Sequence, residues 1–484
     1  MGTLAVVALV GRMVLLFSLL TLVPLAFAWF GQDRGQPAFM TATAVTFTAG
    51  VLMSLTTRRF RRELQPRDGF LLVTLTWLVL LAFGALPLWL AIPDLSVTDA
   101  YFEAMSAFTA TGATALSGLD ALPLSVNVWR CFMMFVGGLG IIVLAVAILP
   151  ILGVGGSQLF KAETAGPMKD QKLTPRIAET ARGIWVAYGL LSVACMLAYR
   201  WAGMSWVDAF MHMCSTVSLG GFSSHDASFG HWDSPLIEGV AMVFMLLSGV
   251  NLLLYYAVWR KRSIGVLWRN VEVRMFYGVL AGSILLIAAY LVATDVHPNV
   301  QDAMRRTAFH VISVATTTGY ASYDYAQWPL FASLLMILLG CFATCAGSTG
   351  GGIKMIRMLL MMAQARRELV RIVHPRVVNP IVIGGRAIDD RTIQGVIAFM
   401  MLYGATLVVL TMVLLFSGLD VVTAFTAVIA CVNNIGPGLG DVGPAVNYGG
   451  LGNFQTRVCT LAMMLGRLEL LSVMVLLVPQ FWRK

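Results

Sequence analysis

Four short glycine-containing motifs hold the residues best suited to chemistry. They read T-A-T-G-A-T (109–114), S-L-G-G-F-S (218–223), T-T-T-G-Y-A (316–321) and N-N-I-G-P-G (433–438). Carbonyl and hydroxyl oxygens can replace the hydration shell of a cation, and glycine allows the backbone to turn its carbonyls towards one line. The aligned glycines are Gly112, Gly221, Gly319 and Gly436, which lie 109, 98 and 117 residues apart. This period predicts four copies of one cation-binding unit, and it disfavours the alternative that the glycines only pack helices closely.

Each motif follows a short apolar stretch that begins near an aspartate. Asp99 and Asp208 precede their aligned glycines by 13 residues, whereas Asp302 and Asp420 precede theirs by 17 and 16, about one helical turn more. Because aspartate is a favoured N-cap, a helix is predicted from each aspartate, too short to span a bilayer and therefore re-entrant. Such backbone is tolerated where it lines a cavity or lies within protein. Four inward-pointing helix C-termini, each with about half a negative charge, would favour a cation on a shared axis.

The composition is that of a protein that crosses a membrane many times. Apolar residues make up 58% of the 484 residues and charged residues only 12%, against about 25% charged in soluble domains. This disfavours a soluble enzyme, a nucleic-acid binder and a disulfide-stapled secreted module. Apolar segments long enough for a hydrocarbon core of about 30 Å lie at 4–29, 38–57, 70–92, 128–152, 183–202, 235–259, 275–294, 329–362, 392–417 and 455–480.

Basic residues concentrate in loops on one predicted side of the membrane. These loops are Arg58 to Arg67, Lys161 to Arg182, Arg260 to Arg274 and Arg366 to Arg391. The positive-inside bias places them and both termini in the cytoplasm, which explains the net charge of +9 without a nucleic-acid partner. Arg12 followed by Ala26-Phe27-Ala28 imitates a cleavable signal peptide; a retained helix fits the topology better, and cleavage stays open.

These features predict an all-α polytopic membrane protein with pseudo-fourfold symmetry around one pore. Two leading transmembrane helices (1–66) precede four repeats, each of helix, pore helix and helix. The repeats are expected at 67–156, 157–262, 263–378 and 379–484, with a glycine-rich intramembrane loop in the third. The seven cysteines lie in apolar context without C-x-x-C spacing, so we expect them to be packing residues.

The third repeat contains an apolar stretch that is too long for one helix. Residues 329–364 would extend about 54 Å at 1.5 Å per residue, and a cluster of glycines interrupts them near the middle. The glycines are Gly347, Gly350, Gly351 and Gly352. Glycine is a poor helix former, so we predict a break whose backbone faces the pore or protein. A phosphate-binding loop is rejected, because the motif reads G-S-T-G-G-G-I-K instead of ending in Gly-Lys-Ser/Thr after a strand.

Two basic residues lie where a membrane protein seldom places them. Arg467 is close to mid-membrane in the last apolar segment, where a charge costs at least about 2.5–3.5 kcal/mol. We hypothesise that it reaches the pore below the motifs and meets the glycine-rich loop as an electrostatic gate. The alternative is a salt bridge, for example with Glu469, that ties helices together. Lys354 is either a second gate residue or a helix-end charge that snorkels to the interface.

The motifs together resemble a known transporter superfamily. T-T-T-G-Y-A, S-L-G-G-F-S-S-H-D, G-S-T-G-G-G-I-K and G-R-L-E are similar to those of the TrkH/TrkG–KtrB–HKT superfamily of potassium transporters, and the two leading helices resemble its TrkH branch. The resemblance covers nearly the whole chain. It implies potassium uptake across a bacterial inner membrane, a homodimer with one pore per subunit, and a cytosolic nucleotide-binding ring similar to TrkA as regulator. It implies potassium as substrate, with no covalently bound cofactor, and an intramembrane gating loop at the glycine-rich break. The implied filter residues are Thr111, Gly112, Gly220, Gly221, Thr318, Gly319, Ile435 and Gly436.

Ion choice and coupling follow less directly. All four aligned positions keep glycine, whereas sodium-preferring members of the superfamily can carry serine in the first repeat, so the resemblance favours potassium. The fourth motif departs most, because Asn434, Ile435 and Pro437 replace hydroxyl residues. The first alternative is an obligatorily coupled potassium/proton or potassium/sodium symporter, which the scarcity of carboxylates within long segments disfavours. A membrane scaffold or enzyme is the second, and no nucleophile–base pair, metal cluster or cofactor motif supports it.

The histidines near the motifs have two expected roles. His212 and His310 lie in the predicted pore helices, where lone histidines are expected to be packing residues more often than sensors. His225 and Asp226 follow the second motif directly, so we expect them at the outer mouth of the pore.

Overall fold

The protein's structure, a computed structural model, describes residues 2–60, 66–140 and 177–483. Within these ranges the regular secondary structure is helical apart from one short antiparallel hairpin, β1 (Val382–Ile383) and β2 (Arg386–Ala387). Gly384 and Gly385 form its two-residue turn with positive φ, as such turns require. The end of the predicted segment 128–152 and most of the basic loop 161–182 lie outside the described residues.

The leading helices pack against the first repeat. They are α1 (Gly2–Leu20), α2 (Leu22–Gly31) and α3 (Gln36–Thr56). Phe17 of α1 places its ring 5.4 Å from that of Phe108 and 5.7 Å from that of Trp129, in the first repeat. Gly50 of α3 faces the backbone of Leu15, where a Cβ would not fit. The first predicted segment is therefore an integral part of the core, although α1 and α2 are separated at Thr21.

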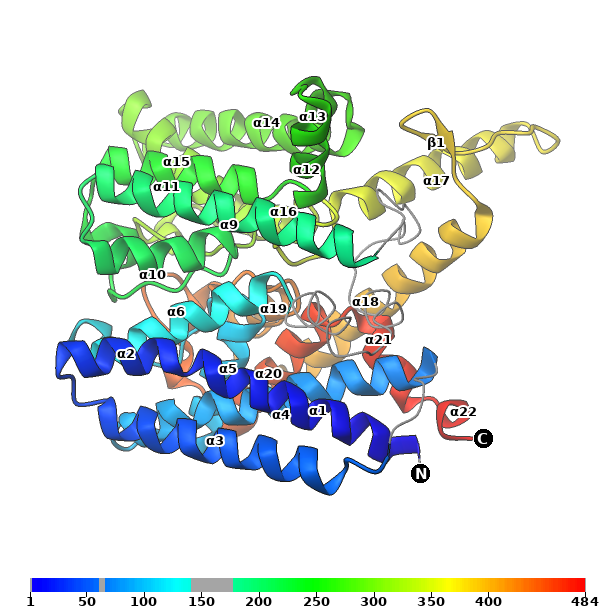
Figure 1. Ribbon diagram of the computed structural model, residues 1–484. Coiled ribbons are helices and arrows are strands. Elements are labelled where there is room, and N and C mark those ends of the chain that lie inside the picture. The colour runs from blue at the N-terminus through cyan, green and yellow to red at the C-terminus, as the bar shows by residue number, and fades with distance from the viewer. Residues whose placement is uncertain (1, 61–65, 141–176, 484) are drawn as a thin grey trace.

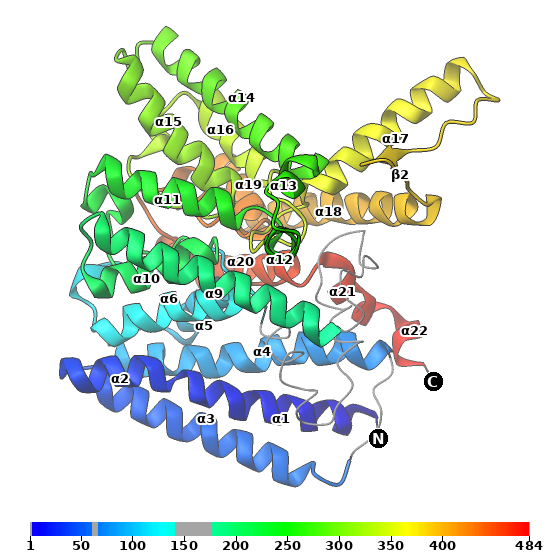
Figure 2. The same cartoon turned by 45° about the horizontal axis from the view of Figure 1, so that its top comes forward.

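The rest of the chain forms four helical units around a common centre (Figures 1 and 2). The first unit contains α4 (Pro66–Ala91), α5 (Val97–Phe108) and α6 (Leu124–Gly138). The second contains α9 (Ile177–Trp201), α10 (Trp206–Val217), α11 (Pro235–Ser248) and α12 (Leu252–Lys261). The third contains α14 (Val271–Ala293), α15 (Val300–Ala315), α16 (Leu330–Gly340) and α17 (Met355–Val373), after the short α13 (Gly265–Arg269). The fourth contains α18 (Asp390–Phe416), α19 (Val421–Val432), α20 (Asn453–Arg467), α21 (Leu470–Met474) and α22 (Pro479–Trp482).

The short helices α5, α10, α15 and α19 begin differently from the prediction. Only Asp420 is an N-cap; the first three helices are capped by Ser96, Ser205 and Asn299. The predicted aspartates of those helices occupy the third helical position, where a carboxylate favours the positive helix end. The aligned glycine follows the first helical residue by 15 positions in repeats 1, 2 and 4, and by 19 in repeat 3. The prediction of one extra helical turn is therefore correct for the short helix of the third repeat and wrong for that of the fourth.

Two predicted spans are bent, which the apolar pattern did not reveal. Segment 235–259 bends by 83° between α11 and α12, and segment 455–480 bends by 108° after α20. At the first bend, a Cβ on Gly249 would meet the ring of Phe276; at the second, a Cβ on Gly466 would collide with the carbonyl of Val432. A side chain thus packs closely against the first bend, and a backbone carbonyl against the second. Within the described residues, six helices are long and apolar enough to span a membrane, or eight if each bent pair is one span.

The second helix of repeat 3 is broken as the glycine cluster predicts. It ends at Gly340 and resumes at Met355, and the loop between them contains Gly347 to Gly352. α17 then extends away from the bundle on the side where the N- and C-terminal ends lie together (Figures 1 and 2). The predicted basic loop 366–391 is on this same side.

Candidate functional site

The four aligned glycines lie around one axis, each repeat touching the next. A Cβ built on any of them would collide with the carbonyl oxygen of the residue that precedes the aligned glycine in the following repeat. The pairs are Gly112 with the carbonyl of Gly220, Gly221 with that of Thr318, Gly319 with that of Ile435, and Gly436 with that of Thr111. The fourth pair closes the circle. All eight implied filter residues therefore come together in one ring.

Each strand of the ring has an unusual backbone. We call residues 109–112, 218–221, 316–319 and 433–436 the filter strands. The aligned glycines have φ angles between 78° and 97°. The residues two positions earlier also have positive φ, between 51° and 62°: Ala110, Leu219, Thr317 and Asn434. Non-glycine residues in this region cost about 1–3 kcal/mol each. The strands therefore hold a strained conformation, in which alternate positive φ angles can turn successive carbonyls to one side.

One hydrogen bond, repeated four times, ties each filter strand to its short helix. The N–H of the residue before the aligned glycine donates to the carbonyl five residues earlier, and the N–O distance is 2.8 Å in every repeat. The pairs are Thr111 with Ser106, Gly220 with Ser215, Thr318 with Ser313, and Ile435 with Ala430. The negative C-terminal ends of α5, α10, α15 and α19 are thereby directed at the ring.

A second brace connects the same helices to the chain beyond the filter strands. It starts nine residues before the aligned glycine, at Glu103, His212 and His310 in the first three repeats. The carboxylate of Glu103 accepts from the N–H of Ala115 (3.0 Å). His212 bonds the hydroxyl of Ser223 (3.0 Å), and His310 accepts from the N–H of Tyr323 (3.2 Å). The histidines are thus buried structural groups, as expected, and the sequence offered the clue in their constant offset.

The fourth repeat is braced by other residues. Position 427 is an alanine, and the hydroxyl of Tyr448 donates instead to the carbonyl of Gly436 (2.9 Å). The side-chain amide of Asn434 donates to the hydroxyl of Thr111 (2.9 Å) and to the carbonyl of Met463 (3.1 Å). Asn434 therefore fixes the first and fourth filter strands to each other.

A fully buried ion pair lies behind the outer part of the ring, and the sequence reading missed it. Nε of Arg130 is 2.7 Å from the carboxylate of Glu103, and neither side chain is exposed. The guanidinium also donates to Thr114 (3.2 Å) and lies over the ring of Phe222, 4.2 Å from its centroid. Arg130 thus links the chain after the first filter strand to the chain after the second.

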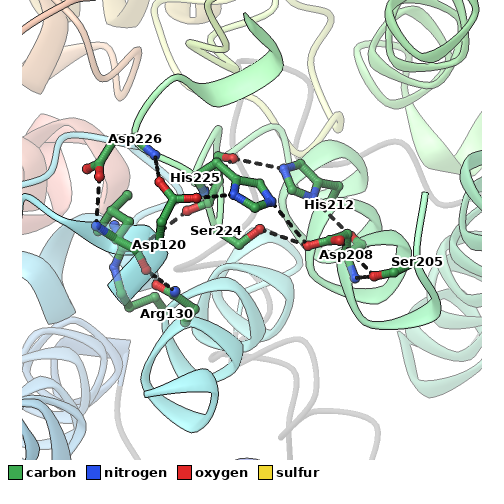
Figure 3. A network of polar contacts seen from close by, with 11 residues as sticks. Asp120, Arg130, Ser205, Asp208, His212, Ser224, His225 and Asp226 are labelled. Carbon is green, nitrogen blue, oxygen red and sulfur yellow. Dashed lines mark hydrogen bonds and ion pairs between the residues drawn. The ribbon is translucent and has the colours of Figure 1, made fainter. Parts of the chain in front are cut away.

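The outer side of the ring opens into a cavity of about 420 Å³. Gly112, Gly221 and Gly319 form part of its lining, together with His225 and Asp226, which agrees with their expected place at the mouth. His225 is hydrogen-bonded through Nδ1 to Asp120 in the opposite loop (Figure 3). This hydrogen bond holds the pKa of the Asp120 carboxyl below its usual value.

The glycine-rich loop lies directly beneath the ring. The N–H of Gly351 donates to the hydroxyl of Thr317 at the base of the third filter strand (2.9 Å). The hydroxyl of Thr349 donates to the carbonyl of Val217, the last residue of α10 (3.0 Å). A Cβ on Gly351 would collide with the carbonyl of Asn433. The loop therefore touches the second, third and fourth repeats at their inner ends.

Arg467 connects this loop to the first repeat. Its guanidinium donates to the carbonyl of Thr349 (3.0 Å) and to the carbonyls of Gly137 and Gly138 at the end of α6 (both 2.7 Å). Lys354 is buried and donates to the carbonyl of Gly350. Its side chain therefore lies against the loop instead of extending towards the membrane interface. The side chains of Arg467 and Lys354 both line a small cavity of about 140 Å³ below the ring.

Two further carboxylates fix the ends of the loop. Glu469 was named in the sequence analysis as a possible partner of Arg467, whereas Glu272 did not stand out. The carboxylate of Glu272, in the first turn of α14, accepts from the N–H groups of Ala346 (2.6 Å) and Ile356 (3.2 Å). Glu469 pairs with Arg357 of α17 (2.8 Å). Glu272 lies at a helix start, where a carboxylate is common, so its sequence position gave no sign of this contact.

We expect the Glu272→Ala variant to be destabilised by about 2–3 kcal/mol. The substitution leaves two N–H groups at the ends of the loop without their acceptor, and an unsatisfied buried donor costs about 1–3 kcal/mol. Unfolding of purified protein in detergent measures the loss, with Glu368→Ala on the exposed part of α17 as the control. A Glu272→Ala protein as stable as wild type would show that the carboxylate does not hold the loop.

The fold and ring define a class before any comparison: a polytopic membrane protein with four re-entrant helices around one cation pathway. Residues 35–484 match the family model described as TrkH, cation transport protein. The chain belongs to this family, which confirms the resemblance seen in its motifs.

Named relatives agree over almost the whole length. The chain is 43% identical to the Trk system potassium uptake protein TrkH of Salmonella typhimurium over 99% of both chains. It is 38% identical to TrkG of Escherichia coli over 98% of this chain and 97% of the relative. The crystal structure of the potassium transporter TrkH from Vibrio parahaemolyticus superimposes with a TM-score of 0.89 at 40% identity, covering all of both chains.

Proposed function

We propose that this protein takes up potassium through the ring of the four filter strands. The observation that carries the proposal is the closed circle of glycine–carbonyl contacts, which gathers oxygen ligands from every repeat on one axis. Such carbonyls replace the water around a potassium ion without an ionised side chain. The helix C-termini directed at the ring lower the energy of the dehydrated cation. The names of the relatives support potassium as the substrate.

The gate of this pathway, in our proposal, is the glycine-rich loop together with Arg467 and Lys354. These two basic side chains donate hydrogen bonds to loop carbonyls beneath the ring. Their positive charges repel a potassium ion that leaves the filter. Arg467 joins the loop to the end of α6, so loop movement requires those bonds to break. We infer that this arrangement is the closed state.

We expect the Arg467→Gln variant to take up potassium about tenfold faster in the absence of any regulator. The substitution removes a positive charge and weakens three charge-assisted hydrogen bonds, each worth about 1.5–3 kcal/mol, that hold the loop in place. Single-channel recording or rubidium uptake measures the effect. Arg457→Gln is the control, because Arg457 lies on the outer, exposed part of the same helix. Unchanged permeation and gating in Arg467→Gln would contradict the gate assignment.

The location and orientation of the protein in the membrane are proposed from the side on which its termini lie. We propose a bacterial inner-membrane location with both termini cytoplasmic, because the termini, α17 and the loop 366–391 share one side and that loop is basic. The same side would receive a cytosolic nucleotide-binding ring similar to TrkA, acting on a homodimer. Co-purification with such a ring tests the regulatory partner. The mass of the purified protein in detergent tests the homodimer.

Ion flux into proteoliposomes tests the transport itself. We expect rubidium to enter faster than sodium, and a current whose reversal potential follows potassium alone. A reversal potential that shifts with pH or with the sodium gradient would instead favour the coupled symporter. The absence of flux for either ion, with and without a cytosolic fraction, would overturn the proposed function.

A further inference from the structure

A pair of stacked histidines stands at the outer mouth, apart from the filter and the gate. The rings of His225 and His231 are nearly parallel, with centroids 3.6 Å apart and an angle of 6° between their planes. His225 comes from the segment after the second filter strand, and His231 ends the short 3-10 turn η3 (Ser228–His231). The stack places two imidazole rings side by side, and each neutral ring has one nitrogen that can offer a lone pair.

Carboxylates approach the stack from two other segments. Asp120, in the 3-10 turn η1 (Leu119–Ala121), is hydrogen-bonded to Nδ1 of His225, and Asp208 of α10 lies 3.5 Å from Nε2 of the same ring. Figure 3 shows His225 between these two aspartates. One ligand atom each from Asp120, His225 and His231 lie within 4.8 Å of one another.

We propose that Asp120, His225 and His231 form a binding site for a divalent transition-metal ion of the zinc class. Two imidazole nitrogens and one carboxylate oxygen are a ligand set that zinc accepts, with water in the fourth position. With metal–ligand bonds of about 2.0 Å, the ligand atoms of a tetrahedral ion lie about 3.3 Å apart. Because the lone pair of an imidazole nitrogen lies in the plane of its ring, the two rings must tilt out of their parallel stack to bind the same ion. When Nδ1 of His225 binds the ion, the one N–H of its neutral ring is carried by Nε2, which lies 3.5 Å from Asp208. Potassium, which prefers oxygen ligands, would not compete here.

The position of the site predicts its effect. His225 lines the outer cavity whose lining also includes Gly112, Gly221 and Gly319. A bound divalent ion adds positive charge beside the path of an entering cation and repels it. External zinc is therefore expected to slow potassium uptake several-fold. This flux effect rests on the proposed function, whereas metal binding does not.

Zinc binding to the purified full-length protein, with any polyhistidine tag removed, tests the site. We expect one zinc ion per chain by titration calorimetry, and affinities about tenfold or more weaker in both His231→Asn and Asp120→Asn. His374→Asn, at the exposed end of α17, is the matched control and should bind as wild type does. Absence of binding by wild type, or equal affinity in the three variants, would overturn the proposal.

Rubidium uptake on the same samples separates the two proposals. External zinc should slow wild type and His374→Asn several-fold and should leave His231→Asn unaffected, while uptake without zinc shows that His231→Asn is folded. Zinc binding in a protein without flux would refute only the proposed function. Flux without zinc binding would refute only the metal site, and binding that does not slow flux would refute its effect on uptake.

Discussion

Replacing Gly221 with alanine is expected to lower potassium uptake about 100-fold. A Cβ at this position collides with the carbonyl oxygen of Thr318 in the next repeat, and the φ of 78° strains any side chain. Strain in this region costs about 1–3 kcal/mol, each 1.4 kcal/mol being a factor of about ten. Displacement of the Thr318 carbonyl also removes an ion ligand. Rubidium uptake into proteoliposomes measures the loss.

Gly239→Ala is the matched control for this prediction. Gly239 lies in α11 of the same repeat, and nothing lies within 4 Å of a Cβ built there. Alanine is about 1 kcal/mol better than glycine within a helix, so this variant should fold and transport normally. If Gly221→Ala transported at the wild-type rate, the circle of carbonyls would not be the conduction path.

The Arg130→Met variant is expected to lose about 3–5 kcal/mol of folding stability. It leaves the fully buried carboxylate of Glu103 without its cation, and breaking a buried pair from one side has this cost. The double variant Glu103→Gln, Arg130→Met removes both charges and should recover most of the loss. Denaturant unfolding in detergent measures all three proteins.

An exposed ion pair provides the control for the buried one. Arg371 and Glu368 of α17 pair at 3.1 Å with side chains 40% and 49% exposed. Arg371→Gln should therefore change stability by less than about 1 kcal/mol. Equal stability of Arg130→Met and Arg371→Gln would show that the buried pair does not brace the two filter segments.

The site could be predicted to the extent that it repeats along the chain. The period of the motifs identified the four aligned glycines, because equivalent positions in four repeats adopt the same geometry. The residue before each glycine, which completes the ring, was implied by the family resemblance. Groups that occur once were harder to find. Glu272 and Arg130 act through partners 74 and 27 residues away, and neither spacing has a local signature.

Sequence by itself determined the membrane class, the four re-entrant units, the glycine ring and the break in the third repeat. Each of these follows from local rules: apolar length, the conformational freedom of glycine and the poor helix propensity of its clusters. The tertiary structure alone decided which carbonyl meets which glycine, where Arg467 donates, and that helices α11 and α20 end in sharp bends. These depend on how closely backbones and side chains from different segments approach, a distance set by packing the whole bundle and not by any one segment.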